Sequence, residues 1–437
     1  MNVLSGSIRS LSPRNSGGLI SNVVARLGAL FSLAFATLLV ARLGGPAAVG
    51  VYALLRVLPS LAGVVLSAGL PGAVTYFLAG PGSTDRRLPS TILAMALVGG
   101  GVGAVLWAVG APVLAHVFFP ELTVGLVAWA GLTVPTQLQV ATVKSFCQGS
   151  DDLRGANWVI LLEEFTFLPA YVALLIVGIR GNVAIIAGLL LADVATFAWT
   201  WSRIVGRGGF REVRPPSWTM ARTIAGYGTR AQVGGVLTLL NLRLDFAILD
   251  AIAGPAVLGT YAIASKFAEL LKILPMALTY VLYPKYSGET RPVAAAHARS
   301  LLPKAGIIVA AAAVPLWVAA TYLLPLVYGD NFRPAIEPAH ILLIGLAAEG
   351  VAGVITAFLY GIGQPGLNSF AMGAGVVVTV VLDVLLIPHL GAVGASVASS
   401  AAYLSSTAAL VAFFFRLTRS DRVGPHAAVA QPGVEVS

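Results

Sequence analysis

The sequence predicts an all-α integral membrane protein with twelve transmembrane helices, arranged as two parallel six-helix repeats around a central cavity. Three observations support this fold: few charges, long uncharged runs and a repeated segment. Apolar residues make up 57% of the 437 and charged residues 10%, whereas a soluble domain carries about 25% charged residues. Uncharged runs cover 88–115, 122–143, 305–329 and 390–415. Each exceeds the ~20 residues that a helix needs to cross the hydrocarbon core.

Helices rather than a barrel are expected, because these runs do not alternate apolar and polar residues. Glycine and proline at the joins delimit twelve spans. They are 19–41, 50–79, 89–117, 122–146, 156–179, 183–205, 221–249, 256–284, 303–328, 337–361, 367–388 and 391–416.

The distribution of basic residues predicts the orientation of these spans. With a cytoplasmic N-terminus, the inside segments hold 18 Lys or Arg residues and the outside segments hold 3, namely Arg42, Arg180 and Arg333. Basic residues concentrate in cytoplasmic loops, so both termini are expected in the cytoplasm. The net charge of +9 is explained by this asymmetry, and nucleic-acid binding is not expected.

A ten-residue segment occurs twice. "GPAAVGVYAL" begins at Gly45 and "GPAVLGTYAI" at Gly254, with six identical positions and a spacing of 209. "GNVAIIAG" from Gly181 and "GAVGASVA" from Gly391 form a second echo, spaced by 210. Since each half has six spans, the halves have the same orientation and face each other across a cavity, as in alternating-access transporters.

The repeat divides the chain into five regions. Residues 1–18 form a cytoplasmic tail, 19–205 an N-lobe with helices one to six, and 206–220 a basic cytoplasmic linker. Residues 221–417 form a C-lobe with helices seven to twelve, and 418–437 a second cytoplasmic tail.

Several basic residues fall inside the predicted spans, where an ionisable group costs about 3 kcal/mol or more and usually faces a cavity or a partner. Arg230 and Lys266 lie near mid-depth, Arg26 lies a third of the way in from the cytoplasm, and Arg56 lies closer to the outer side. We expect these four residues to bind an anionic substrate such as a diphosphate, which arginine can contact through two hydrogen bonds at once.

Acidic residues in the spans are candidates for charge pairing or for coupling to a cation. Lys266, Glu269 and Lys272 are spaced by three residues, so Glu269 can pair with either lysine. Asp193 and Glu349 are isolated acids near mid-span, and each is expected to pair with a basic residue or to carry a coupling cation. Solvation near the interfaces is expected to account for the remaining charges, which are Glu163, Glu164, Arg243, Asp245 and Asp383.

Five segments resemble the Wzx-type polysaccharide flippases of the MOP exporter superfamily. They are the stretch from Ala41 to Pro71, the stretch from Asn241 to Pro275, "YPKYSG" from Tyr283, "VYGDNFRPA" from Val327 and "IPHLGAVGASVAS" from Ile387. The resemblance covers essentially the whole chain and implies a MATE/MOP-like fold. It further implies that the protein is a flippase in a bacterial inner membrane, which moves lipid-linked oligosaccharides or glycolipids to the outer leaflet for polysaccharide biosynthesis.

The lipid II flippases of the same superfamily carry essential basic residues on helices one, two and eight. Arg26, Arg56 and Lys266 fall near those positions, and Glu269 matches an acid on helix eight. "RVLPS" lacks the asparagine of the lipid II pattern, and two helices are missing. The resemblance therefore favours a different polyprenyl-linked glycan as cargo, with glycosyltransferases or a polymerase of the same pathway as partners.

Two other function classes stay open. A MATE-type cation-coupled multidrug antiporter would place acids in its cavity, whereas the deep charges here are mostly basic. A polytopic glycosyltransferase would place an acid in the first outer loop, and residues 42–49 contain none. We therefore expect no catalytic residue, no enzyme activity, no metal site and no cofactor, while sodium or a proton could serve as the coupling ion.

Overall fold

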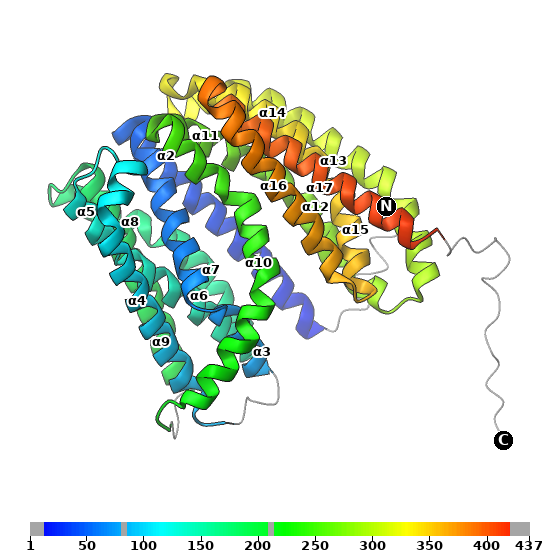
Figure 1. The fold of residues 1–437 in the computed structure, drawn as a ribbon, viewed down its shortest axis with the longest axis horizontal. Helices are drawn as coiled ribbons and strands as arrows, with labels where there is room; N and C mark the ends of the chain where they lie inside the picture. Colours follow the sequence, from blue (N-terminus) through cyan, green and yellow to red (C-terminus); the bar gives the residue numbers. More distant parts are fainter. Residues whose placement is uncertain (1–12, 80–84, 209–213, 420–437) are drawn as a thin grey trace. The chain divides into compact units, whose positions relative to one another are not determined.

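The described chain consists of helices joined by turns (Figure 1). The computed structural model describes residues 13–79, 85–208 and 214–419, and those ranges contain no strand, which confirms the predicted all-α class. Nine segments of the described chain are long and apolar enough to cross a membrane, and one of them, Val24–Gly63, includes parts of the first two predicted spans. Predicted spans seven and eight are not among the nine, so the count of twelve stays a prediction.

The chain forms two compact units. The first comprises the chain up to Leu239 together with Leu249–Ala262 and Val327–Asn331. The second comprises Leu240–Ile248, Ile263–Leu326 and the chain from Phe332 onward. The first unit takes residues from both halves of the sequence, whereas the second unit takes residues from the second half alone. The predicted boundary between the lobes in 206–220 is not tested by this division and stays a prediction.

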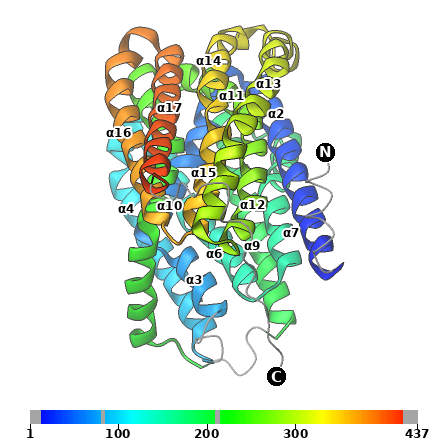
Figure 2. The same ribbon diagram turned by 90° about the vertical axis from the view of Figure 1, so that its right-hand side faces the viewer.

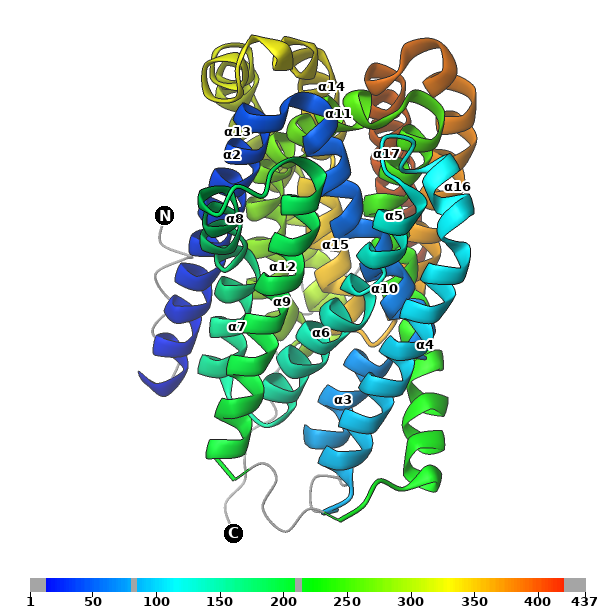
Figure 3. The same ribbon diagram turned by 90° about the vertical axis from the view of Figure 1, so that its left-hand side faces the viewer.

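The first unit is built mainly from the helices of the first half. They are α2 (Pro13–Leu66), α3 (Leu70–Ala79), α4 (Leu88–Val117), α5 (Val124–Ala130), α6 (Thr133–Gly149), α7 (Leu153–Phe165), α8 (Phe167–Ile176) and α9 (Gly181–Gly206). α6 is central, because it packs against α2, α3, α4, α7 and α9. Figure 3 shows α7, α9 and α6 side by side.

Two later helices contribute to both units. They are α10 (Trp218–Ala253) and α11 (Pro255–Ala268). Gly254 separates them with φ 81° and ψ 171°. Gly45 kinks α2 with nearly the same values, φ 69° and ψ −167°. Only glycine adopts this conformation readily, and the proline that follows each glycine fits the start of a helix. The two copies of the repeated segment thus have equivalent backbones.

A second proline explains a hydrogen bond within α2. Pro59 has no amide hydrogen, so it cannot bond to the carbonyl group of Leu55, four residues earlier. Gln137 of α6 supplies the missing donor, with its Nε2 atom 3.1 Å from the Leu55 oxygen. The Gln137 side chain therefore links α6 to α2 where Pro59 leaves a backbone acceptor of α2 without its helical donor.

The second unit contains the remaining helices. They are η2 (Glu269–Lys272), α12 (Ile273–Ser287), α13 (Arg291–Tyr328), η3 (Asp330–Ala335), α14 (Ile336–Ala347), α15 (Glu349–Gly361), α16 (Pro365–Leu390) and α17 (Ala392–Leu417). α17 packs against α14, α15 and α16, and α12 packs against α15. Figure 2 shows α16 and α17 running side by side.

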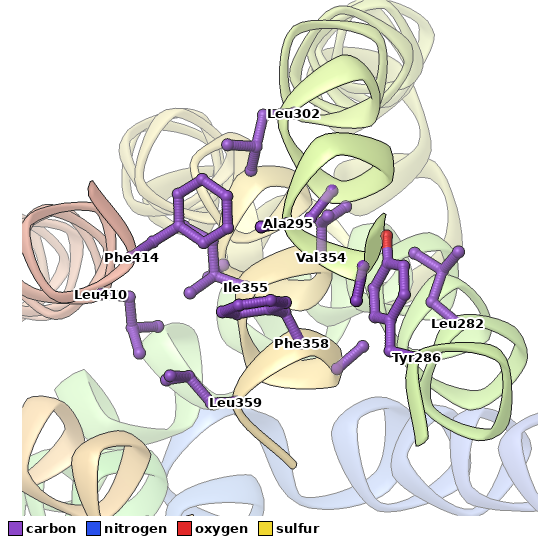
Figure 4. Packing of buried hydrophobic residues seen from close by; sticks show 14 of the residues in the cluster. Leu282, Tyr286, Ala295, Leu302, Val354, Ile355, Phe358, Leu359, Leu410 and Phe414 are labelled. Carbon is purple, nitrogen blue, oxygen red and sulfur yellow. The ribbon is translucent and has the colours of Figure 1, made fainter. Parts of the chain in front are cut away.

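Aromatic rings fill the core of the second unit (Figure 4). Phe358 of α15 lies with its ring centroid 5.1 Å from that of Phe414 of α17 and 6.3 Å from that of Tyr286 of α12. Both contacts are edge-on, the arrangement that aromatic quadrupoles favour. This core fixes α12, α15 and α17 against one another. Glu349 of α15 and Tyr403 of α17 belong to the surroundings of Lys272 described below.

Candidate functional site

A charged cluster within the first unit is centred on Arg56. Its Nη2 atom lies 2.6 Å from Oε1 of Glu164 on α7. Its Nη1 atom donates to the hydroxyl oxygen of Tyr52 at 2.9 Å, and the guanidinium carbon lies 5.6 Å from the centre of that tyrosine ring. Because the arginine and the glutamate are 23% and 18% exposed, the ion pair is largely shielded from solvent.

A second ion pair adjoins this cluster. Lys144 Nζ lies 2.8 Å from Glu163 Oε2, and Arg26, which is exposed, is near enough to Lys144 to interact with it electrostatically. The prediction that Glu163 and Glu164 are simply solvated is wrong, because both are partly buried in ion pairs. The depth in the membrane predicted from sequence could not show which basic residue lies beside each glutamate.

Asp193 is the third acid of the first unit. It is buried, with 8% of its surface exposed, and its Oδ2 atom accepts a hydrogen bond from Thr136 Oγ1 at 2.8 Å. Among the described side chains its carboxylate is bonded to this hydroxyl group and not to a cation. The expected charge pair is therefore not formed there, and a role in cation coupling stays a prediction.

The second unit contains a cluster centred on Glu269. Its Oε1 atom accepts from Arg243 Nη1 at 2.9 Å, and its Oε2 atom lies 3.2 Å from Lys266 Nζ. Of the two lysines that could pair with Glu269, the structure selects Lys266. Arg243 is the second partner, so the prediction that solvation at the interface accounts for Arg243 is wrong.

Lys272 has a separate environment. Its Nζ atom lies 3.7 Å from Glu349 Oε1 and 4.8 Å from the centre of the Tyr403 ring. The local backbone explains the separation of the two lysines. Pro275 cannot bond to the carbonyl group of Leu271, and the predicted eighth helix becomes a 3₁₀ turn, η2, at Glu269–Lys272. The tighter turn changes the direction of Lys272 relative to Lys266.

The sequence carries a signal for this site that the Gly-Pro repeat does not reveal. "LLRVLP" from Leu54 and "LLKILP" from Leu270 share four of six positions and place a basic residue three positions before a proline. Their spacing is 216, seven more than that of the Gly-Pro repeat. Arg56 and Lys272 each pair with a glutamate and lie over a tyrosine ring. Lys272, rather than Lys266, is therefore the counterpart of Arg56.

Two acids of the second unit are buried, contrary to the expectation that they are solvated. Asp383 of α16 is 0% exposed and Asp245 of α10 is 3% exposed, and they are near enough to interact electrostatically. Asp245 accepts from Ser399 Oγ at 3.2 Å, whereas neither carboxylate oxygen of Asp383 has a hydrogen-bond partner in the described chain. Burial without a partner requires protonation or a neutralising cation.

The predicted substrate-binding residues are divided between the units. Arg26 and Arg56 belong to the first unit and Lys266 to the second. Arg230 also belongs to the first unit, but its side chain lies outside the described residues. Within the described chain, no group of three or more His, Cys, Asp or Glu side chains is placed to hold a metal ion. The arrangement offers shielded cations, held in place by carboxylates and tyrosines, that can donate hydrogen bonds to an anion.

Comparison with known proteins agrees with this arrangement. Residues 39–337 match the family model described as polysaccharide biosynthesis protein. The probable low-salt glycan biosynthesis flippase Agl15 of Haloferax volcanii is 22% identical over 83% of this chain and 75% of its own length.

Two solved structures share the fold. The lipid II flippase MurJ in an inward closed conformation has a TM-score of 0.73 at 14% identity, covering 92% of this chain and 90% of its own. An inward-facing MATE family multidrug resistance transporter of the MOP superfamily has a TM-score of 0.72 at 16% identity, covering 92% and 98%. All three relatives are named as flippases or transporters, in agreement with the prediction that the chain is not an enzyme.

The family match covers more than half of the chain and the fold is that of the MOP exporters, as the five sequence segments predicted. The chain belongs to the polysaccharide biosynthesis protein family.

Proposed function

We propose that the protein moves a polyprenyl-diphosphate-linked oligosaccharide, or a related glycolipid, from the cytoplasmic to the outer leaflet by alternating access. The observation that carries the proposal is a set of cations, each paired with a glutamate, within the predicted spans of a polysaccharide biosynthesis protein: Arg56, Arg243, Lys266 and Lys272. A lipid-linked glycan with a diphosphate needs such groups, because its charge must cross a medium that does not solvate it.

Arg56 is well suited to contact a phosphate while it remains paired. A guanidinium group has five N–H donors. Glu164 and Tyr52 accept from two of its nitrogen atoms. The carboxylate and the tyrosine fix the plane of the guanidinium group, so less rotational freedom is lost when an anion binds.

The remaining parts of the proposal concern the setting of the transport step. We place the protein in a bacterial inner membrane with both termini in the cytoplasm. Glycosyltransferases of the pathway would deliver the cargo to the protein, and a polymerase would receive it after transport. A proton or sodium ion bound at the buried acids Asp193 or Asp383 would couple transport to an ion gradient, since each of these carboxylates lacks a cation among the described side chains.

A flipping assay with charge-balanced variants tests the proposal. Purified protein is reconstituted in liposomes with a polyprenyl-diphosphate disaccharide, and a membrane-impermeant lectin reports the exposed glycan. We expect Arg56→Gln combined with Glu164→Gln to reduce transport by tenfold or more, the equivalent of ~1.4 kcal/mol, because the cation that contacts the phosphate is lost. The double variant leaves no unpaired carboxylate, so its folded yield should stay near that of the wild type.

The matched control is Lys144→Gln combined with Glu163→Gln, which removes the neighbouring ion pair of the same unit. It should transport normally. Equal loss in both double variants would show a general effect of charge removal, and wild-type transport by the Arg56–Glu164 variant would remove Arg56 from the site. If the wild type does not move the lipid but transports a dye in exchange for a cation in the same liposomes, the protein is a multidrug antiporter and the flippase proposal is wrong.

A further inference from the structure

The two copies of the repeated segment touch each other inside the first unit. Gly50 is the sixth residue of the first copy and Gly259 the sixth of the second. A β-carbon added to Gly50 would fall on the carbonyl oxygen of Pro255 and lie 2.7 Å from the carbonyl carbon. A β-carbon added to Gly259 would fall on the carbonyl oxygen of Pro46 and lie 2.7 Å from that carbonyl carbon. Each copy therefore places its glycine against the proline of the other.

This contact joins backbone to backbone. Side chains can rotate to relieve a clash, but a helical carbonyl group can move only with its helix. Gly259 is also close to Gly50, since its added β-carbon would lie 3.0 Å from the Gly50 nitrogen atom. Such close helix crossings require small residues at the point of contact. The α2–α11 crossing is thus set by two glycines that no other residue can replace without separating the helices.

The surroundings show that the crossing excludes solvent. Val49, Val51, Leu258 and Tyr261 flank the two glycines and are 0–1% exposed. A polar contact involves a residue close to Gly45 in the sequence. Arg42 Nε donates to the carbonyl oxygen of Val327 at 2.9 Å, which attaches the last turn of α13 to the part of α2 that precedes Gly45. By the predicted topology, all these segments lie at the outer ends of their helices.

We infer that the Gly50–Gly259 crossing is the outer closure of the transport path, which must separate for cargo to reach the outer leaflet. This inference rests on the proposed function, because alternating access requires the outer ends to part and rejoin. The glycines make the closed form possible by allowing van der Waals contact between the two backbones. A single methyl group at either glycine would prevent that contact and shift the population towards the open form.

Thiol labelling of intact cells tests the inference without any cargo. Cys147 is replaced by alanine and Val49 by cysteine, and a membrane-impermeant maleimide is added from outside. Position 49 is 1% exposed, so labelling is expected only when the crossing opens. We expect Gly50→Ala and Gly259→Ala each to increase the labelling rate about tenfold or more, which corresponds to ~1.4 kcal/mol in favour of the open form. Labelling of the variant with both alanines should be little faster than that of each single variant, because either methyl group already prevents the same backbone contact.

Gly101→Ala is the matched control. Gly101 lies within helix α4, and nothing lies within 4 Å of an added β-carbon, so labelling at position 49 should not change. Unaltered labelling in Gly50→Ala and Gly259→Ala proteins that are present at the wild-type level would overturn the inference. If neither alanine variant accumulates, the Val49→Cys chain with both glycines intact decides. Slow labelling of the thiol at position 49 under transporting conditions supports the closure, and complete protection of that thiol from the maleimide refutes it.

The two proposals fail separately in this design. Faster labelling without any glycan flipping by the wild type would preserve the closure and remove the flippase assignment. Normal flipping by the wild type, together with unaltered labelling in both glycine variants, would preserve the flippase and place the closure elsewhere.

Discussion

The basic residues of the two charged clusters are neutralised locally by carboxylates. Arg56 and Glu164 pair in the first unit, and Glu269 is shared by Arg243 and Lys266 in the second. Removing one member of the Arg56–Glu164 pair leaves a charge with no counter-ion, which costs about 3–5 kcal/mol when the site is buried. Single charge-removing variants therefore combine loss of substrate contact with loss of stability, and the two effects separate only in double variants.

Asp152 allows a residue-scale prediction about pH. It precedes α7 and accepts from the Gly155 amide at 2.9 Å, from Arg203 at 3.0 Å and from Arg207 at 2.8 Å. Burial raises the pKa of Asp152, but the hydrogen bonds from Arg203 and Gly155 and the charges of both arginines lower it, and the net pKa is below the ordinary value.

A carboxylate with a lowered pKa stabilises the fold above its unfolded pKa of about 3.9, and this stabilisation is lost as the pH falls through the folded pKa. We expect Asp152→Asn to lower the free energy of unfolding by about 1–2 kcal/mol at pH 7, and by less at pH 3, below the unfolded pKa of the carboxyl group. Thermal unfolding in detergent at both pH values measures this. Asp151→Asn is the control, since Asp151 is exposed with φ 56°, a conformation that asparagine tolerates. Equal effects of the two variants at pH 7 would contradict the prediction.

The sequence alone predicted five charged residues that the structure places in ion pairs, and of their pairings it offered only that of Glu269 with Lys266 or Lys272. Charge and depth were sufficient to select Arg56, Lys266, Glu269, Lys272 and Glu349. The pairing of Arg56 with Glu164 joins residues 108 positions apart, and the pairing of Arg243 with Glu269 depends on where α10 passes α11 and η2. Such contacts depend on helix rotation, which hydrophobicity cannot specify when all faces of a helix are apolar.

At the scale of helices, prolines and glycines account for most differences from the predicted spans. The first two spans form one helix kinked at Gly45. The second span ends early, at Leu66, because Ala68 and Gly69 have positive φ angles. The eighth is interrupted by η2. Each interruption has a local cause in the sequence, yet a turn of this kind inside a long apolar run is not distinguishable from a loop by composition.

The Gln137 contact gives a prediction at this scale. Gln137→Met removes the donor to the Leu55 carbonyl group, which Pro59 cannot replace. We expect the free energy of unfolding to fall by about 1–2 kcal/mol, the cost of an unsatisfied acceptor in an apolar environment, with a lower melting temperature in detergent. Gln148→Met on the exposed side of the same helix is the control and should not lower it. A melting temperature for Gln137→Met equal to that of the control would show that Leu55 does not depend on this bond.

For the whole molecule, orientation in the membrane is the property to measure first. The excess of basic residues in the predicted inner segments places Ser287 in the cytoplasm and Asn331 outside, and both are exposed. In a Cys147→Ala background, an impermeant maleimide added to intact cells should label Asn331→Cys, and should label Ser287→Cys only after the membrane is permeabilised. The reverse pattern would invert the topology and with it the proposed direction of transport.

More of the fold than of the candidate site could be predicted from the sequence. Low charge, long apolar runs and a repeat constrain a membrane protein strongly, since backbone hydrogen bonds must be satisfied within each span. The repeated Gly-Pro segment correctly predicted two structurally equivalent positions, because Gly45 and Gly254 have matching backbone angles. The contact between the two copies was not foreseen, since equal sequence does not by itself imply adjacency.

That mutual contact is of the kind found in an isologous interface, where residue i of one subunit meets j of the other and j meets i. Here both partners lie on one polypeptide, and the two segments keep this reciprocal contact although they differ at four of their ten positions. The helix positions Gly50 and Gly259 are consequently under a joint constraint: each copy of the segment must remain complementary to its own duplicate, whatever changes elsewhere in either half.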